Sequence, residues 1–333
     1  MPAGVRRIIN TVKLTLKALA LTAFLMTSGC ASMLDESDAL AVVPYRIDRH
    51  DLIVVEASVN ERGPFNFALD TGASISSIFD PLRDDLAIDS IPGKRAIVHG
   101  AIASGEFDVL HVDQIRIDRE IWAQPTIVSL PGATLASAGI RGVLGVDFLR
   151  RYAVAFSARD NVVRLYPPHR VANRSYRGWA TVPLRAETIG ESGAALYFFD
   201  VEVDGYEIAA AFDLGAEVNL MNWAGAKSMG VRTGKGRSGR ELSGAFDSMP
   251  IAARLRSKLV KTANIRWRNE SFAIADLNIF STLDREDSPT AILGVGLFTQ
   301  RDFIIDFERN RLLVKISMDE VDDPTTFAER DSD

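Results

Sequence analysis

The sequence predicts an all-β protein of two lobes that arose by internal duplication. Short runs in which apolar, often β-branched residues alternate with polar ones recur along the chain, as in strands that bury one face. Three sequence elements also occur twice, in the same order and at nearly constant spacing. The chain has 333 residues, of which 47% are hydrophobic and 25% charged, so it is long enough to form two packed lobes.

The three repeated elements are a Val-Pro pair that opens each copy, an Asp-x-Gly-Ala turn, and an apolar-Leu-Gly element that precedes an apolar strand. The pairs are Val43-Pro44 and Val182-Pro183, Asp70 and Asp213, and Val143-Leu144-Gly145 and Ile292-Leu293-Gly294, with offsets of 139, 143 and 149 residues. Since the offsets drift by only a few residues, the order indicates duplication of a whole lobe.

Within each copy, the alternating runs predict the strands and leave room for only brief helices. In the run that leads to Asp70, Phe65, Phe67 and Leu69 point to one face, and Asn66, Ala68 and Asp70 to the other. The other strands are expected at Leu52–Val55, Ala153–Phe156, Val163–Tyr166, Phe198–Val203, Ile208–Phe212, Phe303–Phe307 and Leu312–Ile316, with helices at Asp147–Tyr152 and Asn222–Met229.

These patterns set the expected boundaries of the lobes. We expect the first lobe over residues 42–168 and the second over 181–316, joined by an Arg-rich, apolar-poor linker at 169–180. Residues 30–41 are polar and acidic and are expected to form a tether. Residues 317–333 are acidic with few apolar side chains and are expected to be a disordered tail.

The N-terminus has the pattern of an export signal, with four basic residues before an apolar run at 18–26 that is too short to span a bilayer. Thr27-Ser28-Gly29-Cys30 resembles the lipobox of bacterial lipoproteins. That resemblance implies that residues 1–29 are a signal peptide and that Cys30 carries a lipid anchor. Because no Asp follows Cys30, it also implies the outer membrane, with the protein facing the periplasm of the cell envelope. The alternative is an ordinary cleaved signal.

Composition argues against several classes of partner and cofactor. The net charge is −6 and the pI about 5.4, which disfavours a nucleic-acid partner. The four histidines lack metal-ligand spacing and Cys30 is the only cysteine, so no metal site is expected. Residues 234–239 match G-x-G-x-x-G outside any βαβ context and predict a basic loop rather than a dinucleotide site. No cofactor is expected.

The Asp-x-Gly turns are the candidate chemical centre. Gly72 lets the backbone turn so that amide groups can stabilise the Asp70 carboxylate, and Ser74 is placed to donate its hydroxyl to the same carboxylate. In the second copy, Gly215 provides the turn after Asp213. The sequence therefore places one carboxylate at the end of a strand in each lobe.

The run Asp70-Thr71-Gly72-Ala73-Ser74, with Val143-Leu144-Gly145 downstream, resembles the aspartic peptidases of the retropepsin and pepsin type. The resemblance covers about residues 41–316. It implies a single-chain, monomeric, two-lobed fold in which Asp70 and Asp213 face each other, hold one water and share one proton. It also implies an endopeptidase that acts on a protein or peptide, without a covalent intermediate, metal or cofactor.

The second copy departs from this family pattern at two positions. The family's Thr donates its hydroxyl across the lobe interface, which Thr71 can do and Leu214 cannot, so we expect a brace from one side only. Glu217 replaces Ser74 and would bring a third acid close to the dyad unless its side chain turns to solvent.

By the same resemblance, a glycine-containing hairpin in each lobe would cover the substrate. The candidates are His99-Gly100-Ala101, with Gly105 adding flexibility, and Ser243-Gly244-Ala245. The alternative for each is a plain surface hairpin.

Two other functions remain open at this point. Asp70 could pair with Asp70 of a second chain, as in homodimeric retropepsins, with the second lobe only supporting the first. Alternatively, the protein could be a non-catalytic envelope protein that binds a peptide or another ligand in the cleft, which Leu214 and Glu217 favour.

Overall fold

The computed structural model describes residues 34–171, 176, 178–189, 194–232, 241–243 and 248–317. The chain divides into two units, Met1–Ser37 and Asp38–Asp333, and the second unit contains both lobes. The predicted signal peptide, Cys30, the 234–239 loop, Gly244 and residues 318–333 of the tail lie outside the described residues. None of the described helices has the length and apolar character needed to cross a membrane.

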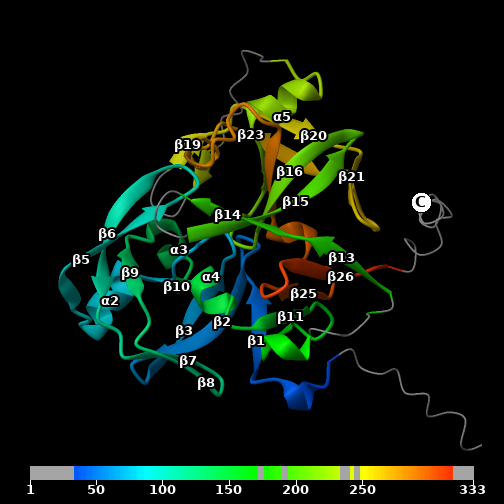
Figure 1. Cartoon of the computed structure of the whole chain (residues 1–333). Helices are drawn as coiled ribbons and strands as arrows, with labels where there is room; N and C mark the ends of the chain where they lie inside the picture. Colours follow the sequence, from blue (N-terminus) through cyan, green and yellow to red (C-terminus); the bar gives the residue numbers. More distant parts are fainter. Residues whose placement is uncertain are drawn as a thin grey trace, which may run out of the picture. The chain divides into compact units, whose positions relative to one another are not determined.

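Strands dominate the first lobe, with short helices after β4, β9 and β10 (Figure 1). Its strands are β1 (Ala41–Ile47), β2 (Ile53–Val59), β3 (Arg62–Leu69), β4 (Ser77–Phe79), β5 (Ser90–His99), β6 (Ser104–Leu110), β7 (Gln114–Ile117), β8 (Glu120–Ala123), β9 (Ile127–Leu130), β10 (Ile140–Leu144), β11 (Ala153–Ser157) and β12 (Val162–Tyr166). Its helices are α2 (Asp80–Leu86), α3 (Ala133–Ser137) and α4 (Val146–Leu149), and short 3₁₀ turns flank the lobe at Glu36–Asp38 and Pro168–Arg170.

The second lobe is built in the same way. Its strands are β13 (Trp179–Pro183), β14 (Arg185–Ile189), β15 (Ala194–Val203), β16 (Tyr206–Asp213), β17 (Asn219–Met221), β18 (Glu241–Ser243), β19 (Ser248–Pro250), β20 (Ala253–Arg256), β21 (Leu259–Thr262), β22 (Ile265–Arg268), β23 (Ser271–Ile274), β24 (Thr290–Gly294), β25 (Phe303–Asp306) and β26 (Arg311–Lys315). Its helices are α5 (Trp223–Ser228), α6 (Asn278–Thr282) and a 3₁₀ turn at Val295–Leu297. The predicted all-β, two-lobed fold is confirmed.

Strand pairing confirms the duplication. In the first lobe, β3 runs parallel to β10, β10 antiparallel to β4, and β4 parallel to β9. In the second lobe, β16 runs parallel to β24, β24 antiparallel to β17, and β17 parallel to β23. The repeated Asp-x-Gly-Ala turns follow β3 and β16, and the repeated apolar-Leu-Gly elements form β10 and β24.

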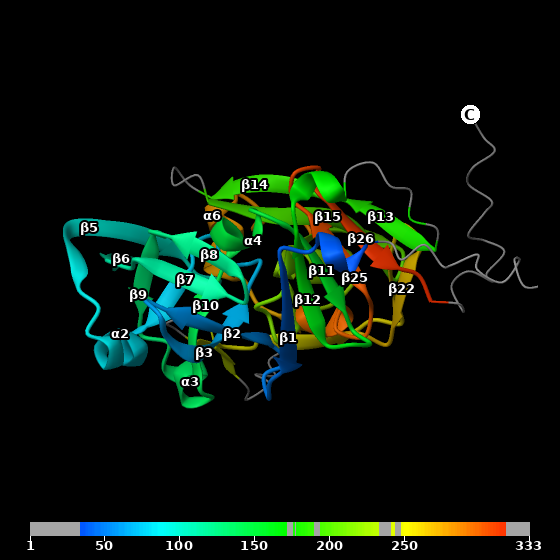
Figure 2. The same cartoon turned by 90° about the horizontal axis from the view of Figure 1, so that it is seen from below.

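A six-stranded antiparallel sheet joins the lobes, in the order β13-β26-β25-β11-β12-β1 (Figure 2). At its centre β11 pairs with β25, with Phe156 opposite Phe303, and their rings stack with centroids 4.3 Å apart. The strands that hold the two Val-Pro elements, β1 and β13, form its two outer edges. Each half of the chain therefore contributes three strands to one shared layer.

The structure moves two of the predicted boundaries by a few residues. Ala39 is 7% exposed and Ala41 is fully buried, paired with Leu165 in β12. The end of the predicted tether at 30–41 therefore belongs to the first lobe, because the alternation that defines β1 begins in it. Likewise β13 begins at Trp179, inside the predicted 169–180 linker.

The strand that leads to Asp70 is covered on both faces. Phe67 and Leu69 belong to the largest buried cluster, which also includes Phe212 of the second lobe, whereas Ala68 belongs to a separate cluster. The predicted alternation is correct, but both sets of side chains are buried, as expected of a strand paired in parallel. This fixed strand determines where Asp70 emerges.

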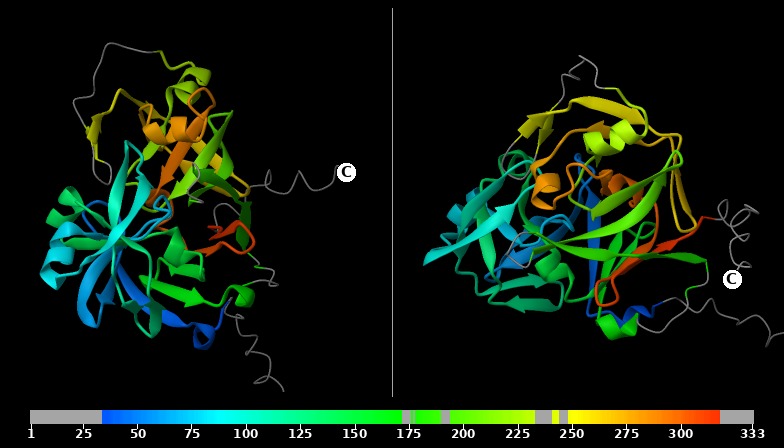
Figure 3. Two further views of the ribbon diagram at one scale, coloured as in Figure 1. Left: turned by 60° about the vertical axis from the view of Figure 1, so that its left-hand side comes forward. Right: turned by 45° about the horizontal axis from the view of Figure 1, so that its top comes forward.

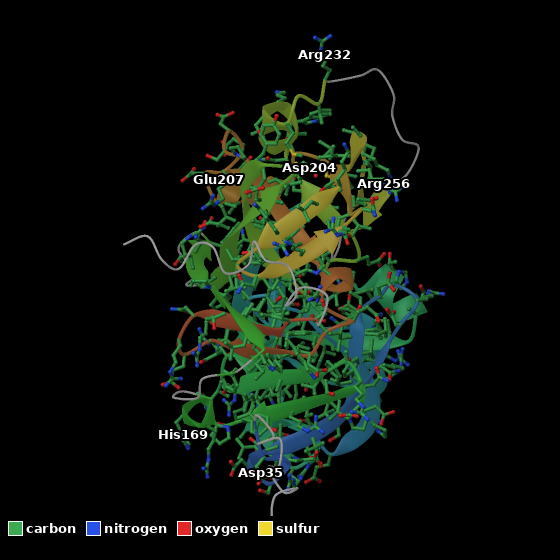
Figure 4. The ribbon with its side chains drawn as sticks, turned by 90° about the vertical axis from the view of Figure 1, so that its right-hand side faces the viewer. Asp35, His169, Asp204, Glu207, Arg232 and Arg256 are labelled. Atoms are coloured by element: carbon green, nitrogen blue, oxygen red, sulfur yellow. The ribbon has the colours of Figure 1, made fainter. Side chains whose placement is uncertain are left out.

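Carboxylate hydrogen bonds also fix a turn away from the dyad, on the exposed surface of the second lobe. Asp204, in the turn between β15 and β16, accepts hydrogen bonds from the amides of Lys258 at 2.9 Å and Leu259 at 2.8 Å (Figure 4). These bonds hold the β15–β16 turn against the start of β21.

Candidate active site

Asp70 and Asp213 lie at equivalent positions and meet each other. Each follows a strand paired in parallel with the apolar-Leu-Gly strand of its own lobe: the Asp70 amide donates to Leu144 O at 3.1 Å, and Asp213 lies beside Gly294. The two carboxyl groups share a hydrogen bond. The structure therefore brings the two predicted acids together within one chain.

The two carboxylates have different hydrogen-bond partners. Asp70 Oδ1 accepts from the amides of Gly72 at 2.7 Å and Ala73 at 3.0 Å. Asp213 Oδ1 accepts from the amide of Gly215 at 2.8 Å, whereas the Ala216 amide donates to the Asp213 carbonyl oxygen at 3.4 Å. Charge-assisted bonds stabilise the ionised form of an acid, and the Gly72 amide also lowers the pKa of Asp213, so backbone amides stabilise both carboxylates.

Close packing, rather than backbone strain, explains the two turn glycines. A Cβ on Gly72 would lie 2.6 Å from the carboxyl oxygens of Asp213, and a Cβ on Gly215 would collide with the carboxyl group of Asp70. Each glycine therefore packs against the acid of the opposite lobe. The sequence predicted glycine here for a turn, and the stronger requirement is the approach of the two loops.

Burial dominates the electrostatics of the dyad. Removal from solvent raises the pKa of Asp70, although its hydrogen bonds to Asp213 and to the loop amides oppose the rise. Burial raises the pKa of Asp213 well above its ordinary value, and the neighbouring Asp70 charge raises it further. The two carboxyl groups therefore titrate as one coupled pair that favours a singly protonated state.

Thr71 braces the two lobes from one side. Its buried hydroxyl accepts a hydrogen bond from the Leu214 amide at 2.9 Å and donates one to the Phe212 carbonyl oxygen at 2.9 Å. Leu214 is fully buried in the main apolar cluster. The expectation of a one-sided brace is confirmed.

The predicted role of Ser74 is wrong, and a different serine anchors the loop. Among the described residues, Asp70 bonds to two loop amides and to Asp213, and Ser74 is not one of its partners. The fully buried Ser76 instead donates its hydroxyl to Asp147 Oδ1 at 2.6 Å and accepts from the Gly145 amide at 2.9 Å. The loop turns so that its second serine, not its first, faces inward.

Asp147 completes this anchor. Its Oδ2 accepts from the Ser76 amide at 2.9 Å, and burial raises its pKa against the opposing effect of these bonds. In the second lobe, Asn219 takes the place of Ser76, and its Oδ1 accepts from the Gly294 amide at 3.0 Å. Sequence reasoning missed Ser76 and Asp147. The sequence did contain a signal for this anchor: Asp147 of the first repeat aligns with Gly296 of the second, so the acid occurs in only one copy.

Glu217 does not approach the dyad. Its Oε1 lies 2.7 Å from Nδ1 of His50, in the turn between β1 and β2 of the first lobe, and its side chain is 45% exposed. The carboxylate that raises the pKa of Asp213 is that of Asp70. The Glu217 carboxylate, which was expected near the dyad, therefore contacts His50 instead. The sequence analysis had not selected this histidine.

The first hairpin candidate, around Gly100, reaches from the first lobe to the second. Strands β5 and β6 form the hairpin, and the Gly100 amide closes its tip by donating to Ala103 O at 2.9 Å. The hairpin extends toward the second lobe (left view of Figure 3), where Ala101 O accepts from the Ile279 amide at 3.2 Å. The Asn278 side chain donates to Ser104 Oγ at 3.2 Å. The tip is thus bound to helix α6.

The same hairpin packs on apolar clusters of both lobes. Its half-buried Val98 and Phe107 pack on the buried cluster that Ala73 and Ile75 also contact. At the tip, Ala101 and Ile102 pack on the second-lobe cluster that Ala216 also contacts. The β5–β6 hairpin and the two Asp-x-Gly loops therefore share the same apolar clusters.

Two further hairpin glycines were predicted. Gly105 lies within β6, and a Cβ there would come 2.8 Å from the Phe107 ring. The absence of a side chain at Gly105 thus leaves room for that ring, and the added flexibility stays a prediction. In the second lobe, β18 and β19 pair as a hairpin, and Gly244 is outside the described residues. Among the described residues no group of three His, Cys, Asp or Glu is placed to hold a metal.

Comparisons with known proteins agree with this geometry. The model of a family described as "Aspartyl protease" matches residues 55–148 and 199–297, which are 94 and 99 of the 333 residues. No curated protein matches the chain.

Two similar solved structures are basic 7S globulin from soybean, with a TM-score of 0.45, and conglutin gamma, a basic 7S globulin from lupine seeds, with a TM-score of 0.48. Each is 11% identical to this chain, and each match covers 83% of this chain and 94% of the other. The family match covers more than half of the sequence, with one region in each lobe. The chain therefore belongs to the aspartyl protease family.

Proposed function

We propose that the protein is an aspartic endopeptidase that hydrolyses peptide bonds with Asp70 and Asp213. The observation that supports this most strongly is the hydrogen bond between the two carboxyl groups, each held by the amides of its own loop. Because the two acids belong to one chain, the proposed enzyme is the two-lobed monomer rather than a homodimer that pairs two copies of Asp70.

The unequal surroundings of the two acids suggest their roles. Ionised Asp70, stabilised by two amides, would take a proton from a water held between the carboxyl groups while the water oxygen attacks the peptide carbonyl carbon. Protonated Asp213 would donate its proton to the carbonyl oxygen. The C–N bond of the tetrahedral diol then breaks as its nitrogen takes the proton now held by Asp70 and one diol hydroxyl returns its proton to Asp213, which leaves a carboxylic acid and an amine.

In this proposal the β5–β6 hairpin covers the dyad, which favours an extended peptide or an unfolded protein segment as the substrate. A folded domain would not fit between the hairpin and the loops without opening the contacts at α6. We further propose that the enzyme acts in the bacterial cell envelope, tethered through a lipid on Cys30 at the outer membrane and facing the periplasm.

Separate Asp70→Asn and Asp213→Asn variants test the proposed reaction. Each should lower the rate of cleavage of an unfolded protein by about 10³-fold or more between acid and neutral pH, the range ascribed to general acid–base groups. Asp89→Asn, on the exposed surface of the first lobe, is the matched control.

Full activity in either dyad variant would refute the mechanism. Activity that is lost on dilution and does not depend on Asp213 would point to the homodimer. Peptide binding without turnover at any pH would instead identify a binding protein.

The anchor is tested separately. Cys30→Ala should abolish incorporation of labelled palmitate and move the protein from the membrane to the soluble envelope fraction. Membrane retention and labelling that are equal to those of the unmodified chain would rule out the lipid on Cys30.

A further inference from the structure

The second catalytic loop has fewer anchors than the first. One amide donates to the Asp213 carboxylate and two to that of Asp70. The first loop also carries the Thr71 hydroxyl, where the second has Leu214. Finally, Asp147 fixes Ser76 in the first lobe, whereas glycine occupies the matching position, Gly296. The loop that holds the proposed acid group thus lacks a counterpart of the Ser76–Asp147 anchor, and Thr71 of the other lobe bonds the residues on either side of Asp213, Phe212 and Leu214.

One contact in the second loop has no counterpart in the first. Glu217, two residues after Gly215, reaches the first lobe and lies with Oε1 2.7 Å from Nδ1 of His50. The His50 side chain is 19% exposed. The contact therefore joins the Asp213 loop to the opposite lobe at a partly sheltered position.

The first lobe holds His50 in place. Asp48 Oδ1 accepts from the amides of His50 and Leu52, each at 2.9 Å, which fixes the turn. Arg49 Nε donates to His50 Nε2 at 3.1 Å. Since Nε2 accepts, the ring proton is on Nδ1 and points at Glu217. The histidine is thus oriented from both sides before it meets the loop.

We propose that His50 is a positioning residue that holds the Asp213 loop through Glu217, in place of the cross-lobe hydroxyl absent at Leu214. This role rests on the proposed peptidase function. It explains why an acid can replace Ser74 so close to the dyad: the acid serves as the loop's tether to the other lobe.

Several charged groups surround the contact. Partial burial, the largest effect, raises the pKa of Glu217, His50 lowers it, and the carboxylates of Asp48 and Asp51 raise it. The net pKa is raised, so the link weakens as acid protonates Glu217. A glutamine at position 217 would still offer an oxygen to the Nδ1 proton at any pH.

The test compares His50→Ala, Glu217→Ala and Glu217→Gln with His111→Ala, an exposed histidine of the same lobe, as the control. We expect the two alanine variants to lower kcat about tenfold or more with little change in KM, since small displacements of reacting groups are costly. The double alanine variant should be no worse than either single variant, because the two residues act as a unit. Glu217→Gln should retain most of the activity at neutral pH.

A second readout does not need turnover. Carboxyl carbon NMR should show a displaced Asp213 titration in His50→Ala and Glu217→Ala, and an unchanged titration in Glu217→Gln and His111→Ala. An inactive wild-type protein would remove the peptidase proposal and leave this arm decisive. An Asp213 titration in both alanine variants equal to that of His111→Ala would overturn the positioning role.

Discussion

Asp70 and Asp213 occupy matching positions in the two repeats, but their surroundings differ. Asp70 receives two amide bonds where Asp213 receives one, and the two pKa values are raised to different degrees. An exactly symmetric pair would leave the roles of base and acid undecided. Here the pKa of Asp213 is raised further than that of Asp70, which favours Asp213 as the proposed acid.

Thr71 should contribute to stability through two buried hydrogen bonds. Thr71→Val keeps the shape of the side chain but leaves the Leu214 amide and the Phe212 carbonyl without their partner. We expect the free energy of unfolding, measured in urea, to fall by about 2 to 4 kcal/mol. Thr71→Ser retains the hydroxyl and should lose much less. Equal losses in both variants would contradict the brace.

Asp213 should reduce stability at neutral pH. Its raised pKa means that the folded state binds the proton more tightly than the unfolded state, so its contribution to stability falls as pH rises through the window between the ordinary and the raised pKa. Asp213→Asn removes the ionisation and should raise Tm at pH 7 but not at about pH 3, below the ordinary pKa of aspartate. A Tm at pH 7 below that of the wild type would contradict the assignment.

At the scale of elements, the β5–β6 hairpin and α6 form one contact across the lobes. The Leu277 N-cap of α6 has no side-chain hydrogen bond, and the Ile279 amide in its first turn is bound by Ala101 O of the hairpin. An amide at a helix start lacks an intrahelical partner, so the hairpin carbonyl completes the helix. Opening the cover would expose that amide.

Hydrogen exchange of the Ile279 amide therefore reports on the hairpin. Ile102→Ser removes an apolar contact at the tip and should speed exchange of this amide by about tenfold, equivalent to ~1.4 kcal/mol. Ile97→Ser, on β5 where the side chain is 58% exposed, should have no effect. Equal exchange in both variants would show that the tip does not cover α6.

The sequence predicted the elements that the duplication repeats, and missed those that differ between the copies. Two copies of one pattern identified Asp70, Asp213 and the strands before them, and the family resemblance identified the hairpin at Gly100. The Ser76–Asp147 contact joins residues that lie 71 positions apart within the first lobe. The His50–Glu217 contact joins residues that lie 167 positions apart in different lobes. No local periodicity encodes such pairs, since they depend on how the loops turn and how the lobes pack.

At the scale of the molecule, the two lobes share a layer and should unfold together. Because β11 pairs with β25, neither lobe completes its part of the six-stranded sheet alone. The same sharing explains why the predicted boundaries were displaced: residues at the ends of each repeat pack into the common sheet rather than into a linker.

Two tryptophans can test this cooperativity, Trp122 in β8 of the first lobe and Trp267 in β22 of the second. Variants that keep one or the other as the only emitter should give the same urea midpoint. Phe156→Ala, at the stacked pair with Phe303, should lower both urea midpoints together. It should reduce the free energy of unfolding by about 3 to 5 kcal/mol. Separate midpoints would show that the lobes unfold independently.

The central claim is that Asp70 and Asp213 form one proton-sharing dyad, and titration of ¹³C-labelled aspartate carboxyls tests it most directly. We predict two separated steps, with the Asp213 step well above the ordinary value near pH 3.9. In Asp213→Asn the upper step should vanish, and in Asp70→Asn the Asp213 step should move to lower pH, because the neighbouring Asp70 charge that raises it is removed. Two carboxyls that each titrate near the ordinary value, with neither affected by substitution of the other, would contradict the claim.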